Sequence, residues 1–398
     1  MEVPTASPDA HGVSSWVHVL GVAAATCAAA ALAALSLGGV GGPGAALPGG
    51  PVSETTVSEA ALHRAEALTP PPELPELLSA TGLYAEPGSR ALHPEVLEFV
   101  PQYPLWSDGA SKRRYLRLPP GSSIDGSSPD AWVFPVGTRF WKEFSLGRRV
   151  ETRTLERLPD GTWRFASYAW DEQGQDARLV PEWGRLRVAP LAQSGLHHDI
   201  PSRGDCVTCH EGGGERAPVL GFTALQLSPD RDARAPHGEV PPSGALDLTD
   251  LISRGLLRGY PTELTRPRVE APADTERAAL GYLHANCAGC HNAHGALADL
   301  ALDFEQLVGD KAGSARVLES VLRRAARFRL PDQERSERVV PGEPAQSVVQ
   351  FRLSSRQLAQ QMPPLGSKVV DQEAAGLVAA WIAQLKTNAP HGADQETP

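Results

Sequence analysis

The chain has 398 residues, of which 41% are hydrophobic, and its formal net charge is −10 at pH 7. This length leaves room for two domains of ordinary size behind an N-terminal leader over residues 1–50. The negative charge argues against nucleic acid or an anionic membrane surface as a partner. With only five cysteines, the chain is also not of the class that several disulfides stabilise.

The leader contains an apolar run over residues 16–40, in which His18 is the only side chain that could carry a charge. The run is long enough to span a bilayer, so it is either a signal peptide or an uncleaved membrane anchor. The fifteen residues before it contain no Lys or Arg, whereas an export signal normally begins with positive charge. Cys27 lies within the run, and we interpret it as a buried leader cysteine. We expect a periplasmic protein, exported or membrane-anchored through residues 16–40.

A linker rich in Pro and Gly at 51–77 precedes a region at 78–265 that has the pattern of an antiparallel β domain. Short segments rich in aromatic and β-branched residues predict strands at 131–136, 139–146, 149–158, 162–170 and 183–189. Turn sequences such as Pro159-Asp160-Gly161 separate them. Six of the eight tryptophans lie between Trp106 and Trp183, which indicates a sheet core, with a ligand pocket as the alternative.

The region at 270–388 has helical patterns instead, and residues 389–398 are expected to form a disordered tail. Asp274 is a candidate N-cap for a first helix, and Pro344 is placed to open a second helix that runs through Leu353. Asp371 is a candidate N-cap for the last helix, whose apolar residues at helical spacing are Leu377, Val378, Trp381 and Leu385. The predicted fold class is α+β multidomain, with the antiparallel β-rich domain followed by an all-α domain.

A C-x-x-C-H motif occurs twice, as Cys206, Cys209 and His210 in "GDCVTCHEGG" and as Cys287, Cys290 and His291 in "HANCAGCHNAH". This motif is the attachment signature of c-type haem, in which the thiols form two thioethers and the histidine binds iron. Four thiolates around one zinc, or two redox dithiols, are the alternatives. Neither alternative requires a histidine directly after both second cysteines. We therefore expect two covalently bound haem c groups.

The two motifs have different predicted settings. The segment before Cys206 is rich in Pro, Gly, Asp and Ser, and we expect the first motif to lie in a loop after the sheet. The second motif follows the apolar stripe of the helix that begins near Asp274, so we expect this helix to deliver Cys287 and Cys290.

Sixth iron ligands are harder to predict. Met362 is the only methionine besides Met1, and the two prolines that follow it stiffen its loop. A thioether ligand raises the potential of a c-type haem, and we predict Met362 as the sixth ligand of haem 2, the haem of the second motif. For haem 1 the tentative candidates are His198, His197 and Lys112, although paired loop histidines are usually solvated and Lys112 lies in a charge run typical of an exposed face. His93, His237 or no ligand at all are the remaining possibilities.

The C-terminal part, from about Asp274 to Leu385, resembles a small helical cytochrome c of the His/Met type. The resemblance depends on "CAGCH", the "MPP" loop and the aromatic residue of the last helix. It implies that the first and last helices cross near the haem, which would bring Gly281 and Tyr282 against Trp381.

The mature chain also resembles a group of bacterial di-haem c-type cytochromes with a Trp-rich β N-terminal domain. The residues that carry this resemblance are "YPLWSDGASKRRYLRLPPG", "FPVGTRFWKEF", "IPSRGDCVTCH" and "VLGFTALQLS". It implies the architecture and the haem content, without an assigned reaction.

The function expected from these patterns is single-electron transfer, in the bacterial periplasm or on the outer side of the inner membrane. The redox donor and acceptor proteins are unknown, and no residue is predicted to be catalytic. The alternative is a haem enzyme, peroxidase-like or substrate-oxidising, with an open coordination site at haem 1 and a pocket in the aromatic-rich domain. Di-haem cytochrome c peroxidases have two full cytochrome folds, however, whereas sheet precedes Cys206 here.

Overall fold

The structure is a computed structural model, and it describes residues 73–193, 195–211 and 218–386. These residues belong to one compact unit, Glu59–Pro398. The predicted leader, most of the linker and the predicted tail lie outside the described residues. Within the described ranges, no helix has the length and apolar character needed to cross a membrane.

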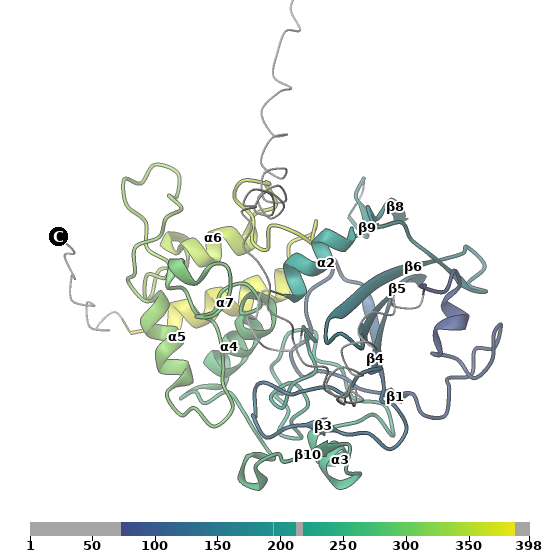
Figure 1. The fold of residues 1–398 in the computed structure, drawn as a ribbon. Helices are drawn as coiled ribbons and strands as arrows, with labels where there is room; N and C mark the ends of the chain where they lie inside the picture. Colours follow the sequence, from purple (N-terminus) through teal and green to yellow (C-terminus); the bar gives the residue numbers. More distant parts are fainter. Residues whose placement is uncertain (1–72, 194, 212–217, 387–398) are drawn as a thin grey trace, which may run out of the picture. The chain divides into compact units, whose positions relative to one another are not determined.

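A six-stranded antiparallel sheet forms one side of this unit (Figure 1). Its strands, in spatial order, are β1 (Leu97–Glu98), β2 (Ser111–Arg117), β4 (Arg139–Leu146), β5 (Arg148–Arg157), β6 (Trp163–Trp170) and β7 (Ala177–Leu179). Gly147 and Gly161 both have positive φ, at 71° and 84°, and allow the tight turns that join β4 to β5 and β5 to β6. The predicted antiparallel sheet is therefore present.

The strand predictions differ in their outcome. The segments at 139–146, 149–158 and 162–170 are confirmed as β4, β5 and β6. The segment at 131–136 is not a strand, since only an isolated bridge joins Val133 to Asp125. The segment at 183–189 belongs to a separate ribbon, in which β8 (Arg185–Pro190) pairs with β9 (His197–Ile200). A third small sheet pairs β3 (Ile124–Asp125) with β10 (Leu257–Arg258).

The two faces of the large sheet bury different aromatic clusters. On one face, Trp141, Tyr168 and Trp170 pack with residues around the 3-10 helix η1 (Leu78–Thr81). On the other face, Phe140 and Phe165 join a cluster that also contains Phe222 and Trp132. The tryptophan cluster is thus largely sheet core, as predicted, but Trp183 is 80% exposed.

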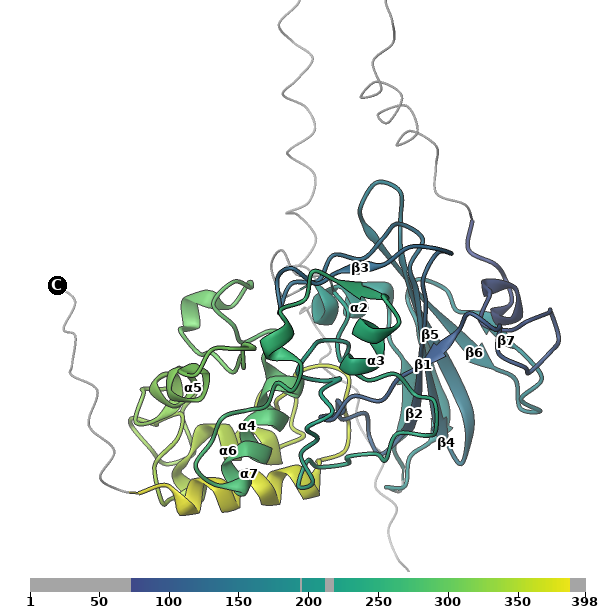
Figure 2. The ribbon, with the colours of Figure 1, turned by 90° about the horizontal axis from the view of Figure 1, so that it is seen from below.

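The helices of the C-terminal part lie on the other side of the unit (Figures 1 and 2). The α-helices are α2 (Arg203–His210), α3 (Leu248–Ser253), α4 (Asp274–Cys287), α5 (Gly313–Val321), α6 (Val348–Ser354) and α7 (Gln372–Gln384). Short 3-10 turns are η2 (Thr262–Leu264), η3 (Ala298–Leu300) and η4 (Pro344–Gln346). Helix α7 packs against both α4 and α6. The protein is therefore of the α+β class.

Helix termini test the predicted caps. Asp371 is confirmed as an N-cap, because its carboxylate accepts a hydrogen bond from the N–H of Ala374 at 3.0 Å. Asp274 is instead the first helical residue of α4, and the N-cap is Ala273. Pro344 opens only the short turn η4, and α6 begins separately at Val348.

Gly281 joins the helical part to the sheet-bearing part. A Cβ atom at this position would lie 2.2 Å from two ring carbons of Tyr103, so only glycine fits. The crossing of α4 with α7 expected from the resemblance is present, and Trp381 donates its indole N–H to Glu276 at 3.3 Å. The nearest side chain to Gly281 is nevertheless Tyr103 rather than Trp381.

Candidate haem attachment site

The first motif lies on α2, so the expectation of a loop is wrong. A capping box begins this helix: Ser202 Oγ accepts from the N–H of Asp205 at 3.1 Å, and the Asp205 carboxylate accepts from the N–H of Ser202 at 3.0 Å. None of its eight residues is buried, so α2 lacks the apolar stripe from which a helix is usually predicted. The spacing of Ser202 and Asp205 was the available signal.

His210 at the end of α2 is oriented by one hydrogen bond and one ring contact. Its Nδ1 lies 2.8 Å from the Pro218 carbonyl oxygen, and its ring centroid lies 5.3 Å from that of Phe165 on β6. A carbonyl can only accept, so Nδ1 carries the proton and Nε2 presents a lone pair. Burial lowers the pKa of His210 to about 4, so the ring is neutral at pH 7. This is the arrangement of a metal-ligating histidine.

The second motif is set in the helical core. Cys287 is the last residue of α4 and packs against the cluster that contains Leu283 and Trp381. Cys290 and His291 follow in a turn in which both N–H groups donate to the Cys287 carbonyl, at 3.1 and 2.9 Å. His291 is 9% exposed, and its ring packs edge-on against Phe304. Among the described residues, its buried Nδ1 has no hydrogen-bond partner.

The two motifs, far apart in sequence, lie against each other in space. A Cβ atom on Gly289, inside the second motif, would lie 3.7 Å from the carbonyl oxygen of Cys209 and 3.8 Å from Leu220 Cδ2. After burial, the electrostatic influence of Cys290 is the largest cause that raises the pKa of the Cys209 thiol. Sequence spacing gave no signal of this contact.

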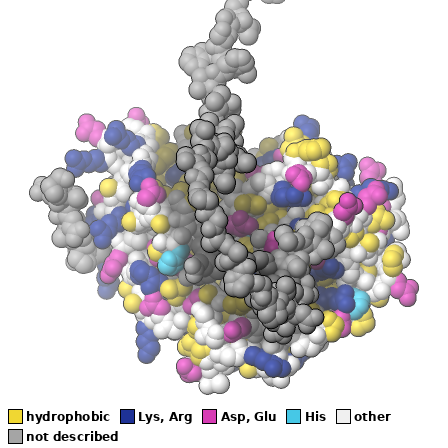
Figure 3. All heavy atoms as spheres, viewed as in Figure 1, with side chains coloured by type: hydrophobic (Ala, Val, Ile, Leu, Met, Phe, Trp, Pro, Cys, Tyr) yellow, Lys and Arg dark blue, Asp and Glu magenta, His cyan; other side chains and the backbone are white. Residues whose placement is uncertain are grey.

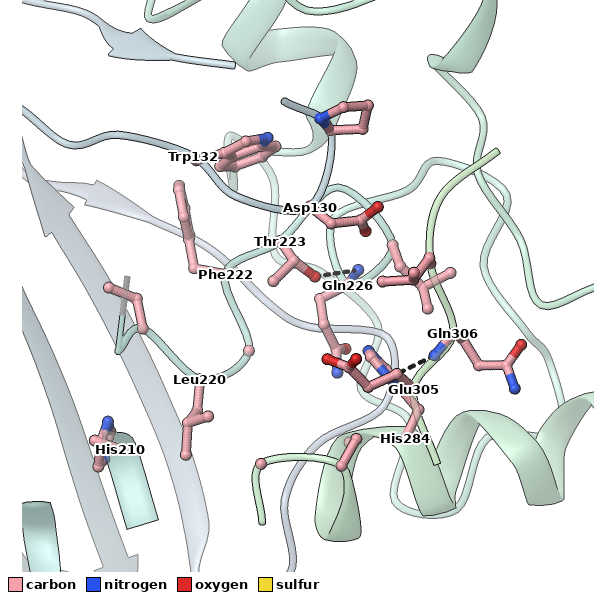
Figure 4. A pocket seen from close by; sticks show the side chains of 18 of the residues that line it. Asp130, Trp132, His210, Leu220, Phe222, Thr223, Gln226, His284, Glu305 and Gln306 are labelled. Carbon is pink, nitrogen blue, oxygen red and sulfur yellow. Dashed lines mark hydrogen bonds between the residues drawn. The ribbon is translucent and has the colours of Figure 1, made fainter. Parts of the chain in front are cut away.

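A pocket adjoins both motifs, and its empty volume is about 980 Å³ with the part open to solvent included. Cys209, His210, Ala288 and Gly289 contribute to its wall. In Figure 4, His210 lies on the side of the sheet, and His284 of α4 lies on the opposite side. His284 Nδ1 accepts from the N–H of Gln306 at 3.1 Å. The sequence analysis did not single out His284, although it precedes Cys287 by about one helical turn.

The four thiols of the motifs are uncombined. Cys206, Cys209, Cys287 and Cys290 are all free, and burial raises the pKa of each, that of Cys287 to about 12. Across the described ranges, no group of three or more His, Cys, Asp or Glu side chains is arranged to hold a metal ion. Haem attachment at these cysteines therefore stays a prediction from the two motifs.

Met362 is held to α6 through Arg352. The N–H of Met362 donates to the Arg352 carbonyl at 2.9 Å, and the Met362 side chain is half-buried. After burial, the charge of Arg352 is the largest cause that lowers the pKa of His291. Arg352 thus bonds to the backbone of Met362 and acts electrostatically on His291, and Met362 as the sixth ligand of haem 2 stays a prediction.

The segment after Met362 is fixed by the loop between β1 and β2. The Asp108 carboxylate accepts from the N–H groups of Lys368 and Val369, both at 2.8 Å. The Trp106 indole N–H donates to the Val369 carbonyl at 2.9 Å. Asp108 and Trp106 belong to "YPLWSDGA", one of the stretches that carry the resemblance. These bonds connect the predicted β-rich and helical regions directly.

Two of the three tentative sixth ligands of haem 1, His198 and Lys112, have a partner for the side-chain nitrogen that would bind iron, whereas the contact of His197 is made by its backbone. His198 is on β9 rather than in a polar loop, is 5% exposed, and its Nε2 lies 2.9 Å from Glu151 Oε1. His197 is half-buried, and its carbonyl accepts from the Lys368 amine at 2.7 Å. Lys112 is on β2 rather than on an exposed face, and its amine donates to the Leu105 carbonyl at 2.6 Å. Burial lowers the pKa of Lys112 to about 7.

The two remaining histidine candidates are also engaged. His237 Nε2 lies 2.8 Å from Asp371 Oδ1, and its ring stacks on Trp106 at a centroid distance of 4.9 Å. His93 Nδ1 accepts from the N–H of Glu95 at 3.2 Å. Of these candidates, only the imidazole of His197 makes no hydrogen bond to the described part of the chain, so His197 stays a prediction for the sixth ligand of haem 1.

Comparison with known proteins gave no match: no family model, no curated protein and no solved structure is similar to this chain.

Proposed function

We propose that the chain is a di-haem c-type cytochrome that transfers single electrons outside the cytoplasm. In this proposal, haem 1 is attached at Cys206 and Cys209 and haem 2 at Cys287 and Cys290. The observation that carries it is the contact between the two motifs, in which Gly289 lies against the Cys209 carbonyl. Two redox groups fixed side by side suit electron transfer, because its rate falls steeply with distance. Bound haem supplies the reversible one-electron chemistry of iron.

The residues around each motif have distinct tasks in this proposal. His210 and His291 are the histidine ligands, and the bond from His210 Nδ1 to Pro218 fixes the ring so that Nε2 points to the metal. Met362, held by the Arg352 carbonyl, is the sixth ligand of haem 2 and raises its potential. Residues 270–388 then form the all-α cytochrome c-type domain, and residues 78–265 form the β-rich domain that carries haem 1.

Location and partners follow from the same chemistry. Covalent haem attachment takes place outside the cytoplasm, so the leader would direct export or anchor the chain through residues 16–40. The donor and acceptor are redox proteins. On the visible part of the face in Figure 3, acidic, basic and apolar side chains are intermingled.

A second candidate function is a haem enzyme with an open site at haem 1. The observation that favours it is the engagement of His198 with Glu151 and of Lys112 with Leu105, which occupies two predicted ligands. Asp130, His284 and Glu305 line the pocket beside His210 and could act on a bound substrate. Rapid binding of cyanide to one ferric haem would favour this candidate over electron transfer.

A spectroelectrochemical titration of the haem-loaded chain tests the proposed function. We expect two one-electron steps and no fast cyanide binding. The Met362→Ala variant should lower the potential of one step only, because a thioether ligand stabilises ferrous iron. Loss of covalent haem, or an iron that cannot be reduced reversibly, would contradict the proposal.

A further inference from the structure

A row of basic residues crosses the sheet in register. Arg114 of β2 is paired with Lys142 of β4, and Lys142 is paired with Arg153 of β5. Ser167 of β6 ends the row. Directly opposed residues of antiparallel strands share a face at about 4.5–5.5 Å between Cβ atoms, where like charges are destabilising. Burial, followed by the charge of Arg114, lowers the pKa of Lys142 well below its usual value, so all three groups can be charged together only with negative charge nearby.

This row lies on the face of the sheet that carries α2. Leu155 and Phe165, two residues along the same face, share a hydrophobic cluster with Cys206. The charges of Lys142 and Arg153 both act on His210, and Arg153 also interacts electrostatically with Cys206. The row thus begins beside the first motif and runs away from it, towards β2.

The carboxylates that the protein supplies are shared or distant. Glu151 is fully buried and lies 2.6 Å from Arg153, but it also lies 2.9 Å from His198. Glu239 is 37% exposed and lies 3.6 Å from Arg114. Within the described ranges, two carboxylates therefore face the three basic groups of the row, and one of the two is shared with a histidine.

The middle and far cations lack full partners. Arg114 is 4% exposed, and its buried Nη2 has no hydrogen-bond partner among the described residues. Lys142 lies 5.3 Å from the centroid of the Phe144 ring and makes no hydrogen bond within the described part of the chain. The amine of Lys112 is on the same face, and burial lowers its pKa to about 7. Unsatisfied buried cations of this kind indicate a site for an anion.

We propose that Arg114 and Lys142, the far and middle members of this row, bind the propionate carboxylates of haem 1. The inference rests on the proposed function. The thioether bonds and the propionates of a haem are at opposite edges of the porphyrin, which matches a row that starts at α2 and extends away from it. Guanidinium and ammonium groups are the usual partners of carboxylates. A free carboxylate ligand would satisfy the same row, so the test must distinguish the two sources.

The Lys142→Gln variant of the haem-loaded full chain tests the inference, with Arg113→Gln as its matched control. Arg113 is the neighbour of Arg114 on the opposite face of β2, is 56% exposed and pairs with Glu98. In Lys142→Gln we expect the propionate modes in the resonance Raman spectrum of haem 1 to shift and its midpoint potential to fall. Both should be unchanged in Arg113→Gln. Lys142→Met, which keeps the apolar stem, is the second variant if glutamine prevents folding.

Two outcomes would overturn the inference. One is a set of propionate modes and a potential that equal those of the wild type, in a variant that still carries both haems. The other is a saturable change in the spectrum of haem 1 when malonate is added, which Lys142→Gln abolishes without shifting the propionate modes. That result would mean that the row binds a free carboxylate instead of the propionates. Absence of covalent haem would refute the proposed function instead, so the two failures are distinguishable.

Discussion

The first motif lies on an eight-residue helix without a buried residue, whereas the second motif ends a fourteen-residue helix in which eight residues are buried. Around the first motif, a capping box, the Pro218 carbonyl and the charged face of the sheet hold the chain. Around the second motif, apolar packing does so. The same pentapeptide can therefore be positioned by polar contacts or by a hydrophobic core.

The largest effect should come from the polar support of the first motif. Glu151→Ala leaves Arg153 without its carboxylate in a buried site, and we expect a loss of about 3–5 kcal/mol in the free energy of unfolding. Chemical denaturation of the haem-loaded protein measures it. The control is Glu98→Ala, whose partner Arg113 is exposed and whose loss should cost at most about 1 kcal/mol. Equal losses in both variants would contradict polar support by the sheet.

The next effect concerns the apolar support of the second motif. Gly281→Ala places a methyl group inside the Tyr103 ring position, and we expect a destabilisation of about 1–3 kcal/mol, measured as a lower Tm. Gly376→Ala is the matched control, because no atom lies within 4 Å of a Cβ atom at this position on α7. That variant should be neutral or stabilise by up to about 1 kcal/mol. An unchanged Tm in Gly281→Ala would contradict this prediction, because it would show that the Tyr103 ring can move away from the added methyl group.

Elements that pack through aromatic and apolar residues could be predicted from the sequence, whereas elements held by polar and charged residues could not. Strands β4, β5 and β6 were predictable because aromatic and β-branched residues mark them. Strand β2 was not, because its inward positions are Lys112 and Arg114, which look like an exposed charge run. Helix α2 was missed because it is short and lacks an apolar stripe.

In the candidate site too, local sequence patterns could be predicted, whereas contacts between distant parts of the chain could not. The two C-x-x-C-H motifs and Met362 are short local patterns that can be recognised in the sequence, and their assignment to haem stays a prediction. The contact of Gly289 with Cys209, and the fixing of the Met362 loop by Asp108, join residues far apart in the chain. Periodicity and spacing carry no information about such pairings.

A smaller effect is expected at the capping box of α2, the helix that carries the first motif. Ser202→Ala removes the capping box of α2, and Asp247→Ala removes the corresponding box of α3. Each should cost about 1 kcal/mol of stability. Only Ser202→Ala should change the spectrum of haem 1. A changed haem 1 spectrum in both variants would mean that stability in general, rather than the position of α2, controls this haem.

The smallest effect is a pH dependence at the contact between the sheet-bearing and helical parts. The hydrogen bond with Asp371 is the largest cause that raises the pKa of His237 above its usual value. This hydrogen bond therefore contributes fully to stability below the pKa that His237 has in the unfolded chain. The contribution is lost as the pH rises through the higher pKa of His237 in the folded protein. We expect His237→Gln to remove this part of the pH dependence, at most about 1 kcal/mol, in unfolding measured from pH 6 to 9. An unchanged difference between variant and wild type over that range would contradict it.

The central claim is that each motif carries its own covalent haem. The most direct measurement is the mass and the alkaline pyridine spectrum of the denatured full chain, produced in a bacterial host with a cytochrome c maturation system. The chain should carry two haems, and the variants Cys206→Ser/Cys209→Ser and Cys287→Ser/Cys290→Ser should carry one each. A wild-type chain without bound haem, or a haem count that neither pair of substitutions lowers, would contradict the account.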